Sequence, residues 1–335
     1  MITLKIIAQH FGVSTAAISK ALNGLPGVSE ELRTAVVAFA RENNYVPNMF
    51  GKGLKGKAPK VMGVIITDNA NPSYSRIVKG VEAEAEKLDY SIILCNSEDK
   101  WSKESRYLEM LVQNSVQGIL IVPAQRDENE PKNRYKILEK ANVPYVLINR
   151  TLEGYDCDTV VADNHRASAM AVDYLVKKGH RNIIHITSDK NISTAVDRMD
   201  GFRRAVEKHG LPVHEKDIYR IHDTDRDACA VAMEEILRQR RDFTAVYAFN
   251  DSMAFGCMKA MAANKIAVPA EMAILGYDDN GFADISLVPL TTVPQPSEYF
   301  GSLAFELIVD KRNTRRTTSM HKVVMPSSII ERNSV

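Results

Sequence analysis

Carboxylate, amide and guanidinium side chains stand at the ends of several apolar runs in the sequence, where they could bind a small polar molecule. Carboxylates and amides form directional hydrogen bonds with hydroxyl groups, and a guanidinium binds hydroxyls or anions. The strand-end residues are Asp68, Asn69, Asn96, Pro123, Asn149, Arg150, Ser188, His222, Asn250, Asp251, Asp278 and Asp279. Arg198 adds a guanidinium from a helical segment. This set favours binding of a small polar ligand, such as a sugar, over its chemical conversion.

Common catalytic and metal-binding patterns are missing from the sequence. No G-x-G-x-x-G fingerprint follows the first apolar run, no G-x-S-x-G elbow occurs, and the His and Cys residues show no ligand spacing. The four cysteines are Cys95, Cys157, Cys229 and Cys257, and none forms a C-x-x-C pair. We therefore predict reduced thiols, no catalytic residue, no metal site and no cofactor.

The segment GKGLKGKA at residues 51–58 raises the question of a phosphate-binding loop. Its first, sixth and seventh residues match the G-x-x-x-x-G-K pattern, in which backbone N–H groups surround phosphates. The next residue is Ala58, where such a loop needs Ser or Thr to hold magnesium, and Pro59 cannot continue the helix that should follow. A helical segment precedes it instead of a buried strand. We therefore interpret residues 47–60 as a linker.

Apolar runs of strand length alternate with amphipathic helical segments from Val61 onward. The runs are VMGVIIT, SIILCN, GILIVP, PYVLIN, NIIHIT, DIYRIH, AVYAFN and MAILGYD. This alternation predicts parallel sheets with helices on both faces, arranged as two similar doubly wound halves. Ligands in such folds bind beyond the carboxyl ends of the strands, so the strand-end polar residues should line one shared cleft.

Three helical segments are predicted before the linker. Thr3, Ser14 and Ser29 are candidate N-caps, and Gly12 ends the first segment. The apolar residues at helical spacing are Leu4, Ile7, Ala8 and Phe11, then Ala17, Ile18, Ala21 and Leu22, then Leu32, Val36, Phe39 and Ala40. Two short helices joined by a tight turn, with a third across them, are typical of a helix-turn-helix DNA-binding domain. A small structural helical cap is the alternative.

The outward face of the second helix carries short side chains at its start and a cation one turn later. These residues are Thr15, Ala16, Ser19 and Lys20. A lysine can donate hydrogen bonds to guanine O6 and N7, and Thr or Ala methyl groups can contact a thymine methyl. The residues expected to contact phosphates are Ser14, Ser19 and Asn23.

Charge is distributed unevenly, although the net charge of the chain is only +1. Residues 1–60 contain eight Lys or Arg against three acidic residues, a net +5, whereas the remainder carries −4. A basic head suits contact with DNA phosphates, and a solvated charged face is the alternative. Without a signal peptide or a long apolar run, we expect a soluble cytoplasmic protein with no membrane contact.

The ordered series of segments resembles one protein family over essentially the whole chain. TLKIIAQHFGVSTAAISKALNG, followed by VSEELRTAVVAFARENNYVPN, is similar to the DNA-binding head of the lactose repressor and purine repressor (LacI) family. The similarity continues through MGVIITDNANPSY, VQGILIVPA, VPYVLINR, AVYAFNDSMAFG, AILGYDD and LTTVPQP to IIERNSV. It implies an all-α head and a two-lobed, periplasmic-binding-protein-like body. It also implies that Thr15, Ala16 and Lys20 occupy positions that contact bases.

The resemblance assigns roles in the linker, PNMFGKGL. Asn48 would cap a hinge helix formed on operator DNA, Leu54 would insert into a minor-groove base step, and Lys52 would follow the phosphates. The equivalent leucine of a partner chain would lie beside Leu54, which implies a homodimer. Two glycines in the segment disfavour a helix in isolation, so we expect it to form on DNA.

In the body, the resemblance implies a ligand pocket between the lobes. The residues at ligand-binding positions are Ser73, Tyr74, Asn149, Arg198, Asn250 and Asp278, and those expected nearby are Asn71, Thr194 and Thr224. The ring of Tyr74 would face the apolar side of a sugar, while the other residues would bond hydroxyls or a charged group. For Asn250 the alternative is a helix cap.

These patterns predict a multidomain, dimeric, sequence-specific transcription repressor whose affinity for operator DNA is controlled by a small polar ligand. The expected boundaries are 1–46 for the helix-turn-helix domain, 47–60 for the hinge and 61–335 for the body. Within the body, the expected lobes are 61–162 with 292–319 (N-lobe) and 163–291 with 320–335 (C-lobe). The alternatives are a sugar-binding protein without DNA function, a nucleobase-responsive regulator whose ligand is a corepressor, and an enzyme fused to a DNA-binding domain.

Overall fold

The computed structural model describes residues 2–43, 45, 60–127, 130–222, 224–314 and 322–335. They belong to two compact units, Met1–Pro59 and Lys60–Val335, called the head and the body below. The predicted hinge residues Asn48, Lys52 and Leu54 lie outside the described residues. In the part of the chain that is described, no helix has the length and apolar character needed to cross a membrane.

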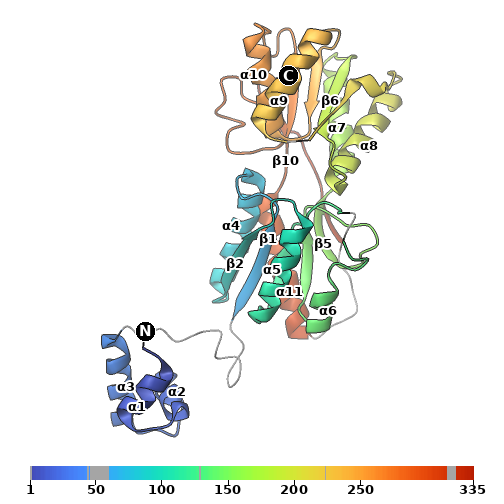
Figure 1. Cartoon of the computed structure of the whole chain (residues 1–335). Helices are drawn as coiled ribbons and strands as arrows, with labels where there is room; N and C mark the ends of the chain where they lie inside the picture. The colour runs from blue at the N-terminus through green and yellow to red at the C-terminus, as the bar shows by residue number, and fades with distance from the viewer. Residues whose placement is uncertain (1, 44, 46–59, 128–129, 223, 315–321) are drawn as a thin grey trace. The chain divides into compact units, whose positions relative to one another are not determined.

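The described part of the head consists of short helices whose ends are set by residues identified in the sequence. The helices are α1 (Leu4–Phe11), α2 (Thr15–Leu22) and α3 (Glu30–Glu42) (Figure 1). The side chains of Thr3, Ser14 and Ser29 accept hydrogen bonds from backbone N–H groups in the first turns, and such a cap contributes ~1 kcal/mol. Gly12 ends α1 with a φ of 64°. The predicted caps and the predicted stop are confirmed.

The apolar faces of these helices meet in one small core. Its buried members are Ile7 and Ala8 of α1, Ile18 and Ala21 of α2, and Val36 of α3. Because Ile18 and Ala21 fix one side of α2 against the other helices, the opposite side of α2 faces solvent.

The N-lobe of the body is built on a parallel sheet with the strand order β11-β5-β4-β3-β1-β2. The strands are β1 (Val61–Ile66), β2 (Ser91–Asn96), β3 (Gly118–Ile121), β4 (Tyr145–Ile148), β5 (Asp158–Ala162) and β11 (Lys322–Met325). The helices are α4 (Pro72–Lys87), α5 (Trp101–Gln113), α6 (Lys136–Ala141) and α11 (Ser297–Thr314). Alternate residues of β1 face opposite sides: Met62 and Val64 pack with α4 and α11, and Val61 and Ile65 pack with α5 and α6.

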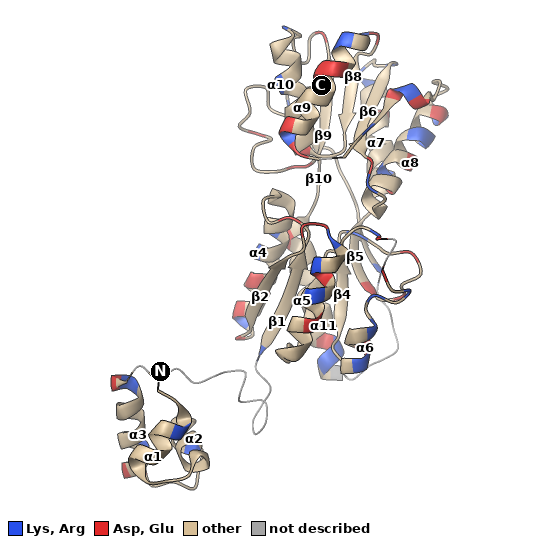
Figure 2. Cartoon of the chain, viewed as in Figure 1, with Lys and Arg blue, Asp and Glu red and all other residues tan. Residues whose placement is uncertain are grey.

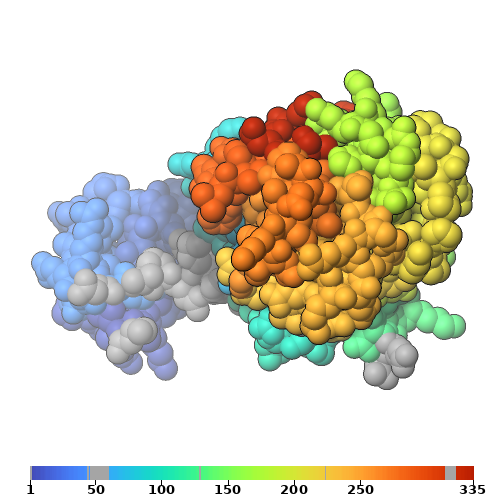
Figure 3. Space-filling view, turned by 90° about the horizontal axis from the view of Figure 1, so that it is seen from above, coloured from blue at the N-terminus to red at the C-terminus, as the bar shows by residue number. Residues whose placement is uncertain are grey.

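The C-lobe contains a second parallel sheet, with the order β10-β9-β8-β6-β7. The strands are β6 (Ile183–Ser188), β7 (Ile218–Ile221), β8 (Ala245–Ala248), β9 (Ala273–Asp278) and β10 (Thr291–Pro294). The helices are α7 (Asn164–Lys177), α8 (Ser193–Lys208), the 3-10 turn η2 (Glu215–Asp217), α9 (Arg226–Gln239) and α10 (Asp251–Ala263). The helices α7 and α8 cover one face, and α9 and α10 lie side by side on the other, as the view onto this lobe shows (Figure 3).

Two of the segments that connect the lobes run differently from the prediction. β10 pairs with β9, so residues 292–294 belong to the C-lobe sheet and not to the N-lobe. β11 pairs with β5, so residues 322–325 complete the N-lobe sheet and not the C-lobe. The chain then returns to the C-lobe, where the Ser334 hydroxyl donates to the Ile274 carbonyl oxygen (2.6 Å). Neither strand was recognised from the sequence, because TTVP has a single aliphatic residue and ends in proline, and KVVM is only partly buried.

Candidate ligand pocket and DNA-binding surface

A cavity of about 260 Å³ lies between the lobes, beyond the carboxyl ends of β1, β4, β8 and β9. Its wall includes all the predicted ligand-binding residues, which are Ser73, Tyr74, Asn149, Arg198, Asn250 and Asp278, and also Asn71, Thr194 and Thr224. The volume is just below the usual range for ligand pockets and suits a monosaccharide-sized molecule. The structure thus gathers these residues around one cavity, and ligand binding by them stays a prediction.

Arg198 and Asp278 form the charged part of the C-lobe wall. The Arg198 side chain is 3% exposed and donates hydrogen bonds to Asn164 Oδ1 (2.9 Å) and Gln295 Oε1 (3.3 Å). Its Nη2 atom lies 3.9 Å from Asp278 Oδ1. Burial raises the pKa of Asp278 to about 6, because the guanidinium of Arg198 offsets only part of the desolvation. Asp278 also has a φ of 111°, and such strain in a non-glycine residue is concentrated at functional sites.

Asn149 and Asn250 use their side-chain oxygens to contact other parts of the body. Asn149 Oδ1 accepts a hydrogen bond from Gln295 Nε2 (3.0 Å), and Asn250 Oδ1 accepts one from the Met253 N–H at the start of α10 (2.7 Å). The helix-cap alternative for Asn250 is therefore correct, and it is compatible with lining the cavity. In both residues the side-chain NH₂ group is the part that can donate to a ligand.

Ser73 and Tyr74 line the N-lobe part of the cavity and are bonded to neighbouring residues. The Ser73 hydroxyl lies 2.8 Å from that of Ser297, and the Tyr74 hydroxyl accepts a hydrogen bond from Arg150 (3.2 Å). Tyr74 is only 7% exposed and packs in the N-lobe core. So little of its ring is accessible that a stacking role on a sugar is not supported, and Tyr74 instead positions Arg150.

Gln295 connects pocket residues of the two lobes and was missed by the sequence analysis. Its Nε2 atom donates to Asn149 (3.0 Å) and lies 3.4 Å from the Ser73 hydroxyl, while its Oε1 atom accepts from Arg198 (3.3 Å). The residue directly follows β10, at a crossing between the lobes. Recognition of the short run TTVP as a strand would have placed Gln295 among the strand-end residues.

A second charged cluster joins the lobes at the same cavity. Asp99 accepts hydrogen bonds from Arg150 Nη1 (2.6 Å), from the Gln125 N–H (3.0 Å) and from Lys190 Nζ (3.2 Å). Burial opposes ionisation of Asp99, but the charges of Arg150 and Lys190 outweigh it and hold the pKa below its ordinary value. Arg150 was among the predicted strand-end residues, whereas Asp99 and Lys190 lie just beyond the ends of β2 and β6.

Several strand-end residues predicted to line the cleft do not line this cavity. They are Asn69, Asn96, Pro123, Ser188, His222, Asp251 and Asp279. Asp251 is completely buried and accepts hydrogen bonds from the Thr292 hydroxyl (2.6 Å) and the Asn280 N–H (2.8 Å). Burial raises its pKa well above the ordinary value. Asp251 therefore braces the segment that follows Asp278 and does not face a ligand.

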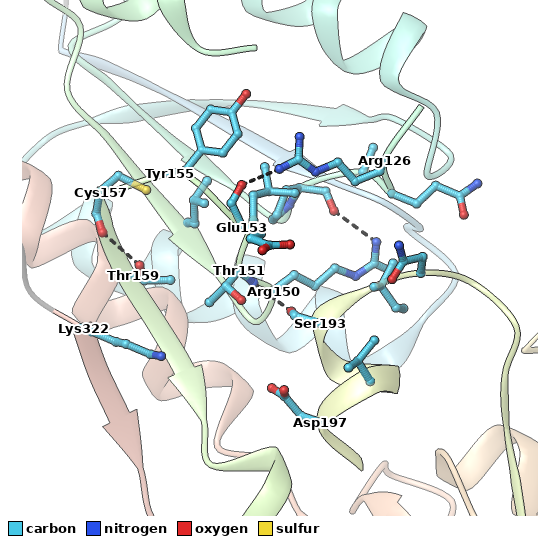
Figure 4. Close-up of a pocket in the computed structure, with 18 of the residues that line it drawn as sticks. Arg126, Arg150, Thr151, Glu153, Tyr155, Cys157, Thr159, Ser193, Asp197 and Lys322 are labelled. Atoms are coloured by element: carbon cyan, nitrogen blue, oxygen red, sulfur yellow. Dashed lines mark hydrogen bonds between the residues drawn. The ribbon is translucent and has the colours of Figure 1, made fainter. Parts of the chain in front are cut away.

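A larger cavity of about 600 Å³ adjoins the first one and shares Arg150 and Ile192 with it (Figure 4). Most of its labelled polar groups are bonded within the protein. The bonded pairs include Arg126 with the Glu153 carbonyl oxygen, Ser193 with the Thr151 N–H (2.9 Å) and Thr159 with the Cys157 carbonyl oxygen (2.9 Å). Lys322 of β11 and Asp197 of α8 reach toward the same space. Both of these charged side chains are exposed, so water can satisfy them without a ligand.

The side of α2 opposite the core carries the residues predicted to contact DNA. Of these, Ser14, Thr15, Ala16, Lys20 and Asn23 are exposed, and Ser19 is half-buried. The acidic residues of the head all lie on α3, while α1 and α2 carry lysines (Figure 2). No acidic side chain on α2 therefore opposes the approach of a phosphate backbone. Contacts of individual residues with bases stay a prediction.

Comparisons with known proteins agree with this architecture. Residues 3–48 match the family model of bacterial regulatory proteins, lacI family, and residues 172–335 match that of a periplasmic binding protein-like domain. The ribose operon repressor of Escherichia coli (strain K12) is 32% identical over 335 residues, all of both chains. The structure of the transcriptional regulator CelR–cellobiose complex covers all of both chains at 27% identity with a TM-score of 0.75. The lac repressor dimer bound to operator and the anti-inducer ONPF has a TM-score of 0.81 at 23% identity, covering 99% of this chain and 98% of that chain.

A helix-turn-helix head joined to a two-lobed binding body defines a ligand-responsive DNA-binding regulator. The chain belongs to the lacI family of bacterial regulatory proteins. The predicted family, fold class and general function are thereby confirmed.

Proposed function

We propose that this chain represses transcription by binding an operator through its head, and that a small sugar or sugar derivative in the 260 Å³ cavity changes operator affinity. The observation that carries this proposal is the position of the cavity, since Asn149 belongs to the N-lobe and Arg198 and Asp278 to the C-lobe. A ligand that bonds both lobes stabilises their closed arrangement. It can thereby shift a conformational equilibrium by its difference in affinity for the two states.

Gln295 connects the proposed ligand residues to a segment that crosses between the lobes. It is hydrogen-bonded to the proposed ligand residues Arg198 and Asn149 and lies at a crossing between the lobes. A ligand that displaces or tightens one of these bonds changes the contacts of the crossing segment directly. We propose that the ligand is released unchanged, because the wall presents amides, a guanidinium and carboxylates suited to hydrogen bonding.

In the head, we assign base contacts to Thr15, Ala16 and Lys20 and phosphate contacts to Ser14, Ser19 and Asn23. The exposed face of α2 and the absence of acidic residues on it support this assignment. The resemblance adds Asn48, Lys52 and Leu54 as hinge contacts to the minor groove and its phosphates. Lys20→Ala should cost ~1–3 kcal/mol on the specific operator and less on random DNA, and equal losses on both would remove Lys20 from base recognition.

The working form of the regulator is proposed to be a cytoplasmic homodimer, because two heads can read two half-sites of one operator. Phe282, Ile285 and Leu287, in the segment after β9, are each more than half exposed. Exposed apolar side chains of this size are typical of protein interfaces. Changing the three residues to Ser should shift the molar mass in solution from dimer to monomer, and an unchanged mass would exclude this segment.

For the domains, we propose residues 1–46 as the DNA-binding domain and 47–60 as the hinge. We propose residues 61–162, 297–314 and 322–325 as the N-lobe and residues 163–294 and 326–335 as the C-lobe. The pairing of β10 with β9 and of β11 with β5 supports these bounds.

The proposed function is tested with an operator selected from random DNA by the purified full chain. Operator affinity is then titrated at one salt concentration with and without each sugar that raises the Tm, since a ligand at 100 times its Kd stabilises the protein by ~2.7 kcal/mol. A sugar that binds and changes operator affinity is the expected result. A binding sugar that leaves operator affinity unchanged would contradict the proposal. A nucleobase that tightens operator binding would favour the corepressor alternative, and turnover of a sugar would reveal an enzyme.

A further inference from the structure

One part of the cavity wall carries two cations for one carboxylate. Arg150 Nη1 lies 2.6 Å from Asp99 Oδ1, and Lys190 Nζ lies 3.2 Å from Asp99 Oδ2. Arg150 is the closer partner and also donates to the Pro123 carbonyl oxygen and the Tyr74 hydroxyl. Within the described residues, the ammonium group of Lys190 makes one contact, the bond to Asp99. An ammonium carries three donors, so Lys190 retains the capacity to bind a further acceptor.

The other charges around the cavity do not cancel this second cation. Arg198 is opposed by Asp278 at 3.9 Å, which leaves that pair near neutrality. Glu98 is half exposed and already paired with Lys103 and Lys100, and Asp68 is exposed. The charged lining side chains that are at most 20% exposed are thus Arg150, Lys190 and Arg198 against Asp99 and Asp278, an excess of one positive charge. A desolvated excess charge of this kind favours a ligand of opposite sign.

An unused donor lies in the same wall. Thr67, the residue after β1, lines the cavity and is 2% exposed. Its hydroxyl has no hydrogen-bond partner in the described part of the chain. A buried hydroxyl without a partner costs free energy, and a ligand oxygen that accepts from it removes that cost.

We propose, on the basis of the proposed function, that the natural ligand is an anionic sugar derivative, either a sugar acid or a sugar phosphate, whose anionic group is bound by Lys190. The hydroxyl groups of the sugar are bonded by Asn149, Asn250 and Asp278. A monosaccharide skeleton with one anionic substituent fits the cavity volume of about 260 Å³. The anion accepts hydrogen bonds from Lys190 of the C-lobe and replaces part of the contact of Lys190 with Asp99 of the N-lobe. Because the sugar is also bonded to Asn149 of the N-lobe, the ligand keeps the two lobes connected.

Four matched pairs of compounds test the charge requirement with the full chain. The sugar-acid pairs are gluconate with glucitol and glucuronate with glucose. The sugar-phosphate pairs are ribose 5-phosphate with ribose and glucose 6-phosphate with glucose. The shift in Tm and the Kd from calorimetry are measured at low and high salt. At least one anionic member should bind ten times more tightly than its neutral partner, and added salt should weaken its binding. The two kinds of pair distinguish a carboxylate from a phosphate.

Lys190→Met should reduce the affinity for the anionic compound at least tenfold and abolish the preference over its neutral partner. Lys190→Arg should restore most of the preference, since it keeps the charge. Lys100→Met is the matched control: Lys100 lies beside Asp99 in sequence and pairs with the rim residue Glu98 at 3.6 Å, so its loss should leave ligand affinity unchanged. The Tm of each variant without ligand confirms that it is folded.

Three results would overturn the ligand class. They are tighter or equal binding of every neutral partner, the lack of binding by any anionic compound, and an unchanged Kd in Lys190→Met. Binding of a neutral sugar that still controls operator affinity would refute the anionic ligand and leave the proposed function intact. An anionic sugar that binds through Lys190 and has no effect on operator affinity would support the anionic ligand and refute the proposed function.

Discussion

Of the two cavities described in the body, the smaller one has the buried polar groups that a ligand could use. The larger one, of about 600 Å³, has some hydroxyls bonded to backbone groups, as with Thr159 and the Cys157 carbonyl oxygen, while its charged side chains Asp197 and Lys322 are exposed and can be solvated by water. The smaller one, of about 260 Å³, contains the Thr67 hydroxyl, which has no partner among the described residues, the strained Asp278 and the second cation Lys190. Unused hydrogen-bonding capacity in a desolvated wall indicates a ligand site better than volume does, because unpaired buried polar groups cost free energy until something binds them.

The largest expected effect comes from Arg198→Ala, which removes the guanidinium of the smaller cavity. Each hydrogen bond from a charged group contributes ~1.5–3 kcal/mol, so ligand affinity should fall about 100-fold or more. Calorimetry with the identified ligand measures the loss. Operator binding without ligand should persist, because the head forms a compact unit of its own.

Arg198→Lys serves as the control for charge alone. A lysine keeps the positive charge and loses the planar array of donors, so it should recover only a small part of the affinity. If Arg198→Ala shows the full increase in Tm with ligand, Arg198 lies outside the binding site and the two cavities have been assigned wrongly.

Asp251→Ala should reduce the free energy of unfolding by ~1–3 kcal/mol, because the Thr292 hydroxyl and the Asn280 N–H lose their buried acceptor. Thermal unfolding without ligand measures this effect. The matched variant is Asp197→Ala in the larger cavity, an exposed carboxylate whose loss should change stability by less than ~0.5 kcal/mol. Equal effects of the two substitutions would show that Asp251 does not brace the smaller cavity.

Ligand affinity should depend on pH through Asp278. A ligand hydroxyl donates to the ionised carboxylate, and the pKa of this group in the free protein is about 6. Affinity is therefore full above that value and is lost as the pH falls through it, by ~10-fold between pH 7 and pH 5. Titration of the Kd over this range tests the sign. Asp278→Asn should bind more weakly at pH 7 and show a flat profile; a profile that persists in this variant assigns the proton to another group.

The smallest effect is expected in the larger cavity. Lys322→Ala removes an exposed cation that reaches into this space, and ligand affinity should change less than ~2-fold. The Kd of this variant, compared with that of Arg198→Ala, ranks the two cavities directly. A tenfold loss in Lys322→Ala would move the ligand site to the larger cavity.

Local features of this protein could be predicted from the sequence where one residue has one physical role. Thr3, Ser14 and Ser29 cap helices, and Gly12 ends α1 with a positive φ, as their types and positions indicated. The long apolar run VMGVIIT was also predicted correctly as a strand, because a continuous apolar run of this length is typical of a strand buried on both faces. The strands β5, β10 and β11 were not identified, because DTVVA, TTVP and KVVM hold few apolar residues in a row, whereas the equally short β3 and β4 lie in the apolar runs GILIVP and PYVLIN.

The wall of the pocket was predicted only in part. Residues at the ends of long strands, such as Asn149 and Asp278, lie at the cavity because the end of a strand fixes their position. Asp99 and Lys190 lie a few residues farther along, where the path of the loop decides whether a side chain turns toward the cleft. Their contact at 3.2 Å depends on how the two lobes close, which local sequence patterns do not encode.

The exchange of the last strands between the lobes has a consequence for synthesis of the protein on the ribosome. The N-lobe sheet lacks its edge strand until β11 has been made. The C-lobe lacks two hydrogen bonds until Ser334 has been made: the one that the Ser334 hydroxyl donates to the Ile274 carbonyl oxygen and the one that it accepts from the Thr291 N–H. Neither lobe can therefore finish folding before the other is almost complete. A nascent chain released after residue 314 would leave both lobes with an exposed sheet edge or terminus, which makes such fragments ready substrates for proteolysis.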